Sequence, residues 1–345
     1  MNPELALTLD LPTLQRALLN RRSLLDQLHG EGTDCYRLFH GAVEGFPGCT
    51  IDRYGGVLLV QTWREPLKAE SLHLIASEIE RTLGFPLQMV WNHRAPSRGG
   101  GRQAFDEWHD PGPLSTCIGT ELGITYDVRP RHQGADPLLF LDFRPGRRRI
   151  RQAAAQTVLN LFAYTCGAGI VSAVAGAREV WNVDFSSGAL NTGACNAELN
   201  GITVGDRFRL IRDDVFAVVR QCAGLPIGGR RSRRRRRPLT LPQRSFDLVV
   251  LDPPRWAKSA FGTVDIVRDY ASLFKPAAMA ASPGGAVLAT NNVASVDRHD
   301  WITAMVRCAE KAGRPVRSVD ILAPERDFPS PDGRPATKMA WFIID

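Results

Sequence analysis

The feature that most constrains the fold is a regular alternation of strand-like and helix-like segments that begins near Gly134. Residues 158–163 (VLNLFA) and 246–251 (FDLVVL) are continuous apolar runs, which are typical of strands covered on both faces. Helix-like segments separate these runs from the strands that follow. This order predicts an α/β domain built on a doubly wound, mostly parallel sheet.

The expected sheet has seven strands, the last two of which fit an added antiparallel edge. The strands are expected at residues 158–163, 179–184, 207–211, 246–251, 286–290, 316–322 and 340–344, and the helices at about 169–177, 187–200, 265–281 and 301–312. A sheet of this kind binds its ligand at the carboxyl ends of the strands, beside the point where the strand order reverses.

The first 135 residues have a different pattern. Residues 11–29 carry leucines at helical spacing and predict one amphipathic helix. From Cys35 onward, short β-branched and aromatic runs separated by glycine and proline predict strands and turns, with a helix at about 67–83. We therefore expect three parts, which are an N-terminal helical segment (1–33), a small α+β accessory domain for substrate recognition (34–135) and the α/β domain (136–345).

The net charge of +7 comes from one short segment. Residues 230–237 (RRSRRRRR) contain seven arginines, and the rest of the chain has a formal charge of zero. The segment lies in a glycine- and proline-rich stretch at 226–242, between the third and fourth strands of the α/β domain. Its composition predicts a disordered, solvated insertion, and such an arm is also able to bind phosphate groups by counterion release.

Cysteine usage and hydropathy exclude several classes of protein. The seven cysteines are scattered, odd in number and form no C-x-x-C pair, so neither a disulfide framework nor a metal site is predicted. No apolar run is long enough to span a membrane, and the N-terminus has no secretion signal. We expect a cytoplasmic protein that holds no metal and does not associate with membranes.

Landmarks of a nucleotide-type ligand site follow the first three strands. The turn at 164–169 (YTCGAG) lets a ligand approach the backbone, although G-x-G is also typical of any tight strand-to-helix turn. Asp184 ends the second strand, where a carboxylate accepts hydrogen bonds from ribose hydroxyls. Asp213 and Asp214 follow the third strand. Asp214 is the expected ligand contact, and a helix N-cap is the alternative for either residue.

The end of the fourth strand narrows the choice of ligand. Residues 251–256 are Leu-Asp-Pro-Pro-Arg-Trp. Two prolines after a buried strand end the ladder and fix the backbone, and Trp256 offers an aromatic face to a flipped-out base. A dinucleotide-dependent dehydrogenase has no use for this arrangement, and the chain lacks a complete G-x-G-x-x-G. A proline-rich loop with a core tryptophan is the alternative without a ligand.

Several motifs, in order along the chain, resemble those of a known family. FLDFRPGRRRI, VLNLFAYTCGAG, WNVDFSSGALNTGACNAELNGI and LDPPRWAKS resemble successive motifs of bacterial 23S rRNA methyltransferases of the RlmI and RlmK type. CYRLFHGAVEGFPGCTIDRYGGVLLVQ resembles the central domain of RlmI-like proteins, so the resemblance covers about residues 34–345. It implies a Rossmann-like class I methyltransferase fold with S-adenosylmethionine (SAM) as cofactor.

The landmarks and the resemblance together define the expected cofactor site. Its residues are Phe162, Tyr164, Thr165, Gly167, Gly169, Asp184, Phe185, Asp213, Asp214 and Asp252, with residues 140–144, Arg144 among them, packed over the cofactor. Cys166, inside the turn, is expected to be a small packed residue.

Two departures from the RlmI-like pattern bear on the substrate. Those proteins carry an N-terminal RNA-binding PUA domain, whereas only a helix-sized segment precedes Cys35. The cytosine-C5 enzymes also place a cysteine after the fifth strand, because C5 needs a thiolate to add to the ring first. Residues 289–293 (ATNNV) contain no cysteine. Asn291 and Asn292 are instead similar to the Ser-Asn-Asn of the RlmK type, which methylates a guanine nitrogen.

We therefore predict an enzyme, a SAM-dependent methyltransferase that acts on a base nitrogen of RNA, most simply ribosomal RNA. Asp252 and the Pro253–Pro254 backbone would orient the acceptor, Trp256 would stack on it, and Asn291 or Asn292 would contact a base edge. Phosphate contacts are expected from Lys258, the arginines at 147–149 and the arginine segment, although plain solvent exposure is the alternative for each.

Two other functions stay open. The absence of a PUA domain and the neutral body of the chain fit a SAM-dependent methyltransferase that acts on a protein or a small molecule. A non-catalytic RNA-binding protein that retained the fold is the second alternative. The sequence leaves the oligomeric state open, with a homodimer as one alternative.

Overall fold

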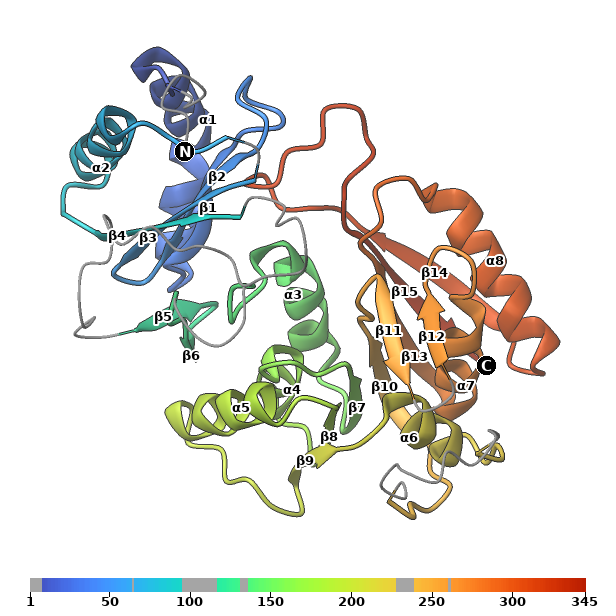
Figure 1. The fold of residues 1–345 in the computed structure, drawn as a ribbon. Helices are drawn as coiled ribbons and strands as arrows, with labels where there is room; N and C mark the ends of the chain where they lie inside the picture. Colours follow the sequence, from blue (N-terminus) through green and yellow to red (C-terminus); the bar gives the residue numbers. More distant parts are fainter. Residues whose placement is uncertain (1–7, 64, 95–116, 131–135, 228–238, 260–261) are drawn as a thin grey trace. The chain divides into compact units, whose positions relative to one another are not determined.

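A computed structural model describes residues 8–63, 65–94, 117–130, 136–227, 239–259 and 262–345, and the chain divides into two compact units. The first unit comprises Met1–Leu141 together with Glu325–Pro331, and the second comprises Asp142–Pro324 and Asp332–Asp345 (Figure 1). Among the helices of the described residues, none is both long and apolar enough to cross a membrane. The arginine segment at 230–237 lies outside the described residues.

The first unit contains a four-stranded sheet in the order β1-β2-β3-β4. Its elements are α1 (Leu11–Gly30), β1 (Cys35–His40), β2 (Cys49–Tyr54), β3 (Val57–Thr62), α2 (Ala69–Leu83) and β4 (Gln88–His93), and the hairpin of β5 (Ile118–Glu121) and β6 (Ile124–Asp127) forms a separate sheet. The first three strands are antiparallel, and α2 connects β3 to the parallel strand β4. The leucines of α1 share a core with the sheet and α2, so the N-terminal helix packs as part of this unit.

The second unit is built on a seven-stranded sheet in the order β14-β15-β13-β10-β7-β8-β9. The strands are β7 (Thr157–Leu161), β8 (Glu179–Asp184), β9 (Phe208–Arg212), β10 (Phe246–Leu251), β13 (Ala281–Asn291), β14 (Val316–Leu322) and β15 (Lys338–Ile344). Five strands are parallel, and β15 is antiparallel to both β13 and β14. The predicted fold class, a mostly parallel sheet with an antiparallel edge, is confirmed.

Helices cover both faces of this sheet. A short 3-10 helix, η3 (Leu141–Phe143), leads into α3 (Arg144–Ala153); α3, α4 (Gly167–Val174) and α5 (Ser187–Leu199) lie on one face, and α6 (Val215–Cys222), α7 (Ala271–Ala280) and α8 (Arg298–Lys311) on the other (Figure 1). Side chains along β13 alternate accordingly. Val287 and Ala289 lie in the core with α7 and α8, whereas Leu288 lies beside Gly146 of α3.

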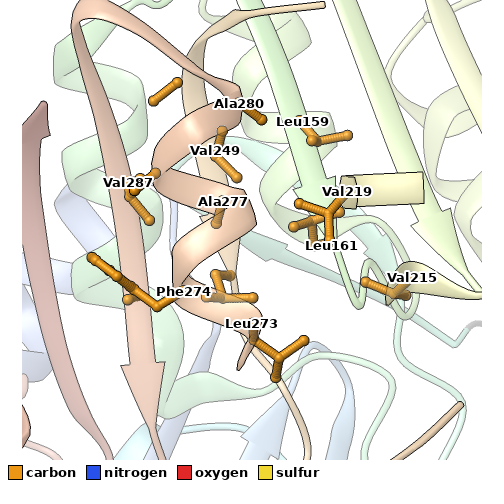
Figure 2. Packing of buried hydrophobic residues seen from close by; sticks show 14 of the residues in the cluster. Leu159, Leu161, Val215, Val219, Val249, Leu273, Phe274, Ala277, Ala280 and Val287 are labelled. Atoms are coloured by element: carbon orange, nitrogen blue, oxygen red, sulfur yellow. The ribbon is translucent and has the colours of Figure 1, made fainter. Parts of the chain in front are cut away.

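The core beneath α6, α7 and α8 is apolar and closely packed. Figure 2 shows Phe274 and Ala277 of α7 among side chains of the sheet, including Val249 and Val287. The Phe274 ring also meets Phe342 of β15 edge-on, with 4.9 Å between the ring centroids. Burial of each large side chain contributes about 1.5–3 kcal/mol, so this core holds the sheet edge on which the site is built.

The stretch between the fourth and fifth strands of the sheet differs from the expectation. A hairpin of β11 (Trp256–Ser259) and β12 (Gly262–Asp265) occupies the stretch after the fourth strand, and α7 begins at Ala271 instead of about 265. The sequence Thr-Val at 263–264 has β-branched side chains, which favour a strand. The Asp265 carboxylate accepts the Val267 N–H at 3.0 Å and so closes a turn that delays the helix. Trp256 therefore begins a strand instead of lying in a loop.

Candidate functional site

The sequence landmarks follow neighbouring strands of the second unit. β7 lies between β8 and β10, so the strand order reverses at β7 and β10, where sheets of this type bind ligands. The turn at 162–169 follows β7, Asp184 ends β8, Asp252 follows β10 and Asn291 ends β13. All four thus belong to the carboxyl edge of the parallel strands.

The turn after β7 has an uncommon backbone. Phe162, Tyr164 and Cys166 have φ angles of 57°, 49° and 64°, a left-handed conformation that is costly for residues other than glycine. Such residues persist only where their surroundings hold them, and they cluster at ligand sites. Cys166 is fully buried, as expected of a packed residue, and burial raises the pKa of its thiol far above the usual value.

Hydrogen bonds from neighbouring elements hold this turn. The Ala163 N–H donates to the Val183 carbonyl at 3.0 Å, and the Asn196 side-chain amide, fully buried in α5, donates to the Thr165 carbonyl at 2.9 Å. The role of Asn196 did not follow from the sequence. Its signal was the asparagine within WNVDFSSGALNTGACNAELNGI, at a buried position of an otherwise small-residue helix.

Gly169 has no room for a side chain. A Cβ atom there would lie 2.0 Å from the Oδ1 atom of Asn182 in β8. That oxygen also accepts the Asn160 side-chain amide of β7 at 2.9 Å, and both asparagines are buried. The two amides form a short polar ladder between the strands, directly against the start of α4. Each is an amide within an apolar strand, which is the sequence signal for this feature.

Asp184 is a buried carboxylate with capacity for a ligand. Its Oδ2 atom accepts the Tyr164 N–H at 2.9 Å, and its Oδ1 atom accepts the Ser186 N–H at 2.8 Å. Burial raises its pKa, and the backbone N–H groups oppose that rise. A carboxylate oxygen has two lone pairs, so each oxygen is able to accept a further hydrogen bond. The next residue, Phe185, is 62% exposed and presents an uncovered ring.

Asp213 and Asp214 both bind backbone N–H groups. Asp214 is the N-cap of α6, because its Oδ1 atom accepts the Phe216 N–H at 2.9 Å. Asp213 accepts the N–H groups of Asp214 at 2.7 Å and Leu239 at 2.6 Å. The helix-cap alternative thus describes Asp214, and a cofactor contact of either residue stays a prediction.

Asp252 directly follows β10 at the carboxyl edge of the sheet. The Thr290 hydroxyl of β13 donates to its Oδ1 atom. Burial raises the Asp252 pKa to about 6; the Thr290 bond and Arg147 oppose this rise, and Asp142 adds to it. Tyr270 donates its hydroxyl to the Thr290 carbonyl at 2.6 Å, which ties the loop before α7 to the same strand end.

The corner after Asp252 combines buried and exposed side chains. Pro253 is buried, whereas Pro254 is exposed. Trp256 is 53% exposed, and the Arg255 guanidinium lies 5.6 Å from the centroid of its ring. An exposed indole at this place offers a stacking surface and contradicts the alternative of a core tryptophan. Lys258 lies in β11, and its side chain is outside what the structure describes.

Asn291 and Asn292 differ sharply in their exposure to solvent. Asn291 is fully buried, and its Oδ1 atom accepts the Val293 N–H at 3.0 Å. Its Nδ2 atom has no hydrogen-bond partner within the described parts of the chain. Asn292 is exposed. A buried amide nitrogen without an acceptor is costly, so Asn291 is the stronger candidate for a ligand contact.

The arginines at the start of α3 do not form a solvated face. Arg144 and Arg147 are buried, and the Arg147 guanidinium lies 5.7 Å from the centroid of the Phe143 ring. Arg149 lies 4.4 Å from the Trp341 ring centroid and 3.5 Å from the Asp320 carboxylate. The expectation that the cluster at 147–149 contacts phosphate is therefore wrong for Arg147, because its side chain packs inside the unit.

Comparisons with known proteins match most of the chain. The family described as S-adenosylmethionine-dependent methyltransferase matches residues 36–342. The ribosomal RNA large subunit methyltransferase I of Aeromonas salmonicida is 29% identical over 329 residues, which cover 93% of this chain and 77% of that protein. A ribosomal RNA large subunit methyltransferase of Deinococcus radiodurans is 28% identical over 312 residues, or 87% of this chain and 70% of that protein.

A solved structure shares the fold. It is that of a protein described as a methyltransferase complexed with S-adenosylhomocysteine, and it covers 96% of this chain and 80% of its own with a TM-score of 0.73 and 21% identity. The sequence match over residues 36–342 also includes every strand of the ligand edge described above. The chain therefore belongs to the family of S-adenosylmethionine-dependent methyltransferases.

Proposed function

We propose that this SAM-dependent methyltransferase transfers the methyl group to a base nitrogen of ribosomal RNA. The observation that carries the proposal is the pair of Asp252 and Asn291 at the ends of the adjacent strands β10 and β13. These positions provide a carboxylate and an amide, and residues 252–256 and 289–293 contain no cysteine that could supply a thiolate. A carbon acceptor such as C5 of cytosine needs a thiolate, whereas a nitrogen carries its own lone pair. The names of the relatives, both rRNA methyltransferases, support RNA as the substrate.

The residues of the turn and of β8 fit the cofactor. The lone pairs that remain on Asp184 would accept the ribose hydroxyls of SAM, and the exposed ring of Phe185 would cover its adenine. The backbone from Phe162 to Gly169 would lie along the remaining part of the cofactor. SAM supplies an electrophilic methyl group when bound.

The acceptor would be held by the corner after β10. The Asp252 carboxylate and the Pro253 and Pro254 carbonyls would orient the nitrogen, and Trp256 would stack on the base. The Asn291 amide would donate to an acceptor atom on its edge. Holding the nitrogen in line with the methyl group and excluding water are the main tasks of the protein, because the donor is already reactive. An rRNA substrate would place the enzyme in the cytoplasm.

Mass spectrometry of rRNA nucleosides tests this proposal. We expect one methylated base to be missing from the 23S rRNA of cells that lack the gene and to return with the wild-type gene. Purified protein should transfer labelled methyl groups to that rRNA. Methyl transfer to a protein or metabolite extract instead, with unchanged rRNA, would favour a protein or a small molecule as the substrate. The neutral charge of the chain outside its arginine segment also fits that alternative.

A further inference from the structure

Lys338 is a buried lysine at the acceptor side of the proposed site. It begins β15 and pairs in register with Asn291 of β13. Its side chain is 3% exposed. The ammonium donates to the Val293 carbonyl at 2.7 Å and to the Ala336 carbonyl at 3.2 Å, and Asp297 provides a favourable charge nearby. A buried ammonium is costly unless hydrogen bonds compensate it, and here both acceptors are backbone carbonyls, one after β13 and one just before β15.

Lys338 and Asn291 both bind the Val293 peptide. The Asn291 Oδ1 atom accepts the Val293 N–H at 3.0 Å, and the Lys338 ammonium donates to the carbonyl of the same residue. Because the Val293 N–H needs an acceptor, the amide of Asn291 must turn its oxygen toward Val293. Its nitrogen then remains a buried donor with no acceptor among the described residues.

We propose that Lys338 is a positioning residue for methyl transfer. By holding the Val293 carbonyl, it keeps the turn after β13 in the shape that directs the Asn291 Nδ2 donor toward the base. The complementary group is a hydrogen-bond acceptor on the base edge, such as a carbonyl oxygen or an unprotonated ring nitrogen. This inference rests on the proposed function, because Asn291 meets a base edge only if a base is the methyl acceptor.

Two lysine variants and a matched control test the role. Lys338→Met keeps the volume of the stem and removes the donor, Lys338→Arg keeps a cationic donor, and Lys311→Met removes an exposed lysine of α8. The substrate is 23S rRNA from cells that lack the gene. We expect kcat of Lys338→Met to fall about tenfold or more, with the Kd of SAM by calorimetry within about twofold of wild type. Lys338→Arg should recover part of the rate, and Lys311→Met should match wild type.

Amide hydrogen exchange provides a readout that needs no RNA. Peptides that cover residues 289–296 should exchange faster in Lys338→Met than in wild type, whereas Lys311→Met should leave them unchanged. If Lys338→Met does not bind SAM, Lys338→Gln provides the same comparison. Unchanged exchange at 289–296, or an unchanged kcat, would overturn the role of Lys338. A wild-type protein that methylates no rRNA would instead overturn the proposed function, and the exchange data would still show whether Lys338 holds the turn.

Discussion

At the scale of single residues, Asp184 and Asp252 show how different hydrogen-bond partners surround two carboxylates of the same sheet edge. The Asp184 carboxylate accepts hydrogen bonds from the backbone N–H groups of Tyr164 and Ser186, whereas the Asp252 carboxylate accepts one from the Thr290 hydroxyl. Burial raises the Asp252 pKa from 3.8 to about 6. A folded-state pKa above the unfolded value favours the neutral form, so its stabilising contribution is complete below pH 3.8 and is lost as the pH rises through about 6. At neutral pH the ionised Asp252 carboxylate therefore opposes folding instead of stabilising the folded state.

The substitution Asp252→Asn separates stability from activity. It keeps an oxygen for Thr290 and removes the charge, so the melting temperature at neutral pH should not fall, while kcat should drop on the order of 100-fold. Wild-type kcat should decrease as the pH falls below about 6, because protonation has the same effect. Thermal unfolding and a pH–rate profile measure the two quantities. A lower melting temperature with normal turnover would assign Asp252 a structural role.

At the scale of elements, the turn at 162–169 depends on how closely α4 approaches β8. The left-handed residues Phe162, Tyr164 and Cys166 shape the turn, and Gly169 lets the helix lie against Asn182. The sequence motif correctly predicted a glycine-rich turn after the first strand. It did not predict the buried asparagine ladder, because a ladder depends on the register between β7 and β8.

Gly169→Ala should therefore damage both packing and ligand binding. The new Cβ would meet a buried amide that is itself hydrogen bonded, so we expect a loss of about 1–3 kcal/mol in the free energy of unfolding and weaker SAM binding. Gly188→Ala in α5 is the matched control, since only the Ser186 Oγ atom lies near its Cβ, at 4.0 Å. That variant should be neutral or slightly stabilising. Denaturant titration and calorimetry provide the measurements, and equal behaviour of the two variants would contradict the packing argument.

At the scale of the whole molecule, the chain passes between its two units more than once. Glu325–Pro331, between β14 and β15, belongs to the first unit. There the Arg37 N–H donates to the Asp327 carboxylate at 3.1 Å, and the Arg37 guanidinium lies 4.5 Å from the Phe328 ring centroid. The predicted division at 33 and 135 did not anticipate this segment, because contacts so distant in sequence leave no local pattern.

The charge of the whole molecule is concentrated in the arginine segment. Replacing its seven arginines by serine would reduce the formal net charge from +7 to zero. If the segment gathers RNA phosphates, the slope of log affinity against log salt should become shallower by up to about 5, while the Kd of SAM stays unchanged. Filter binding of 23S rRNA at several salt concentrations measures the slope. An unchanged slope would identify the segment as a solvated insertion.

The sequence by itself correctly predicted the fold class and the cofactor, and it singled out the four strand ends of the candidate site. Apolar periodicity and turn residues are local properties, and they were sufficient to predict β8, β10 and β14 with the bounds that the structure has. Tertiary structure alone decided which side chains meet at those ends. Lys338 faces Asn291 only because β15 inserts between β13 and β14, and Thr290 reaches Asp252 only because β13 lies beside β10. Strand order and register arise from long-range packing, which no local pattern records.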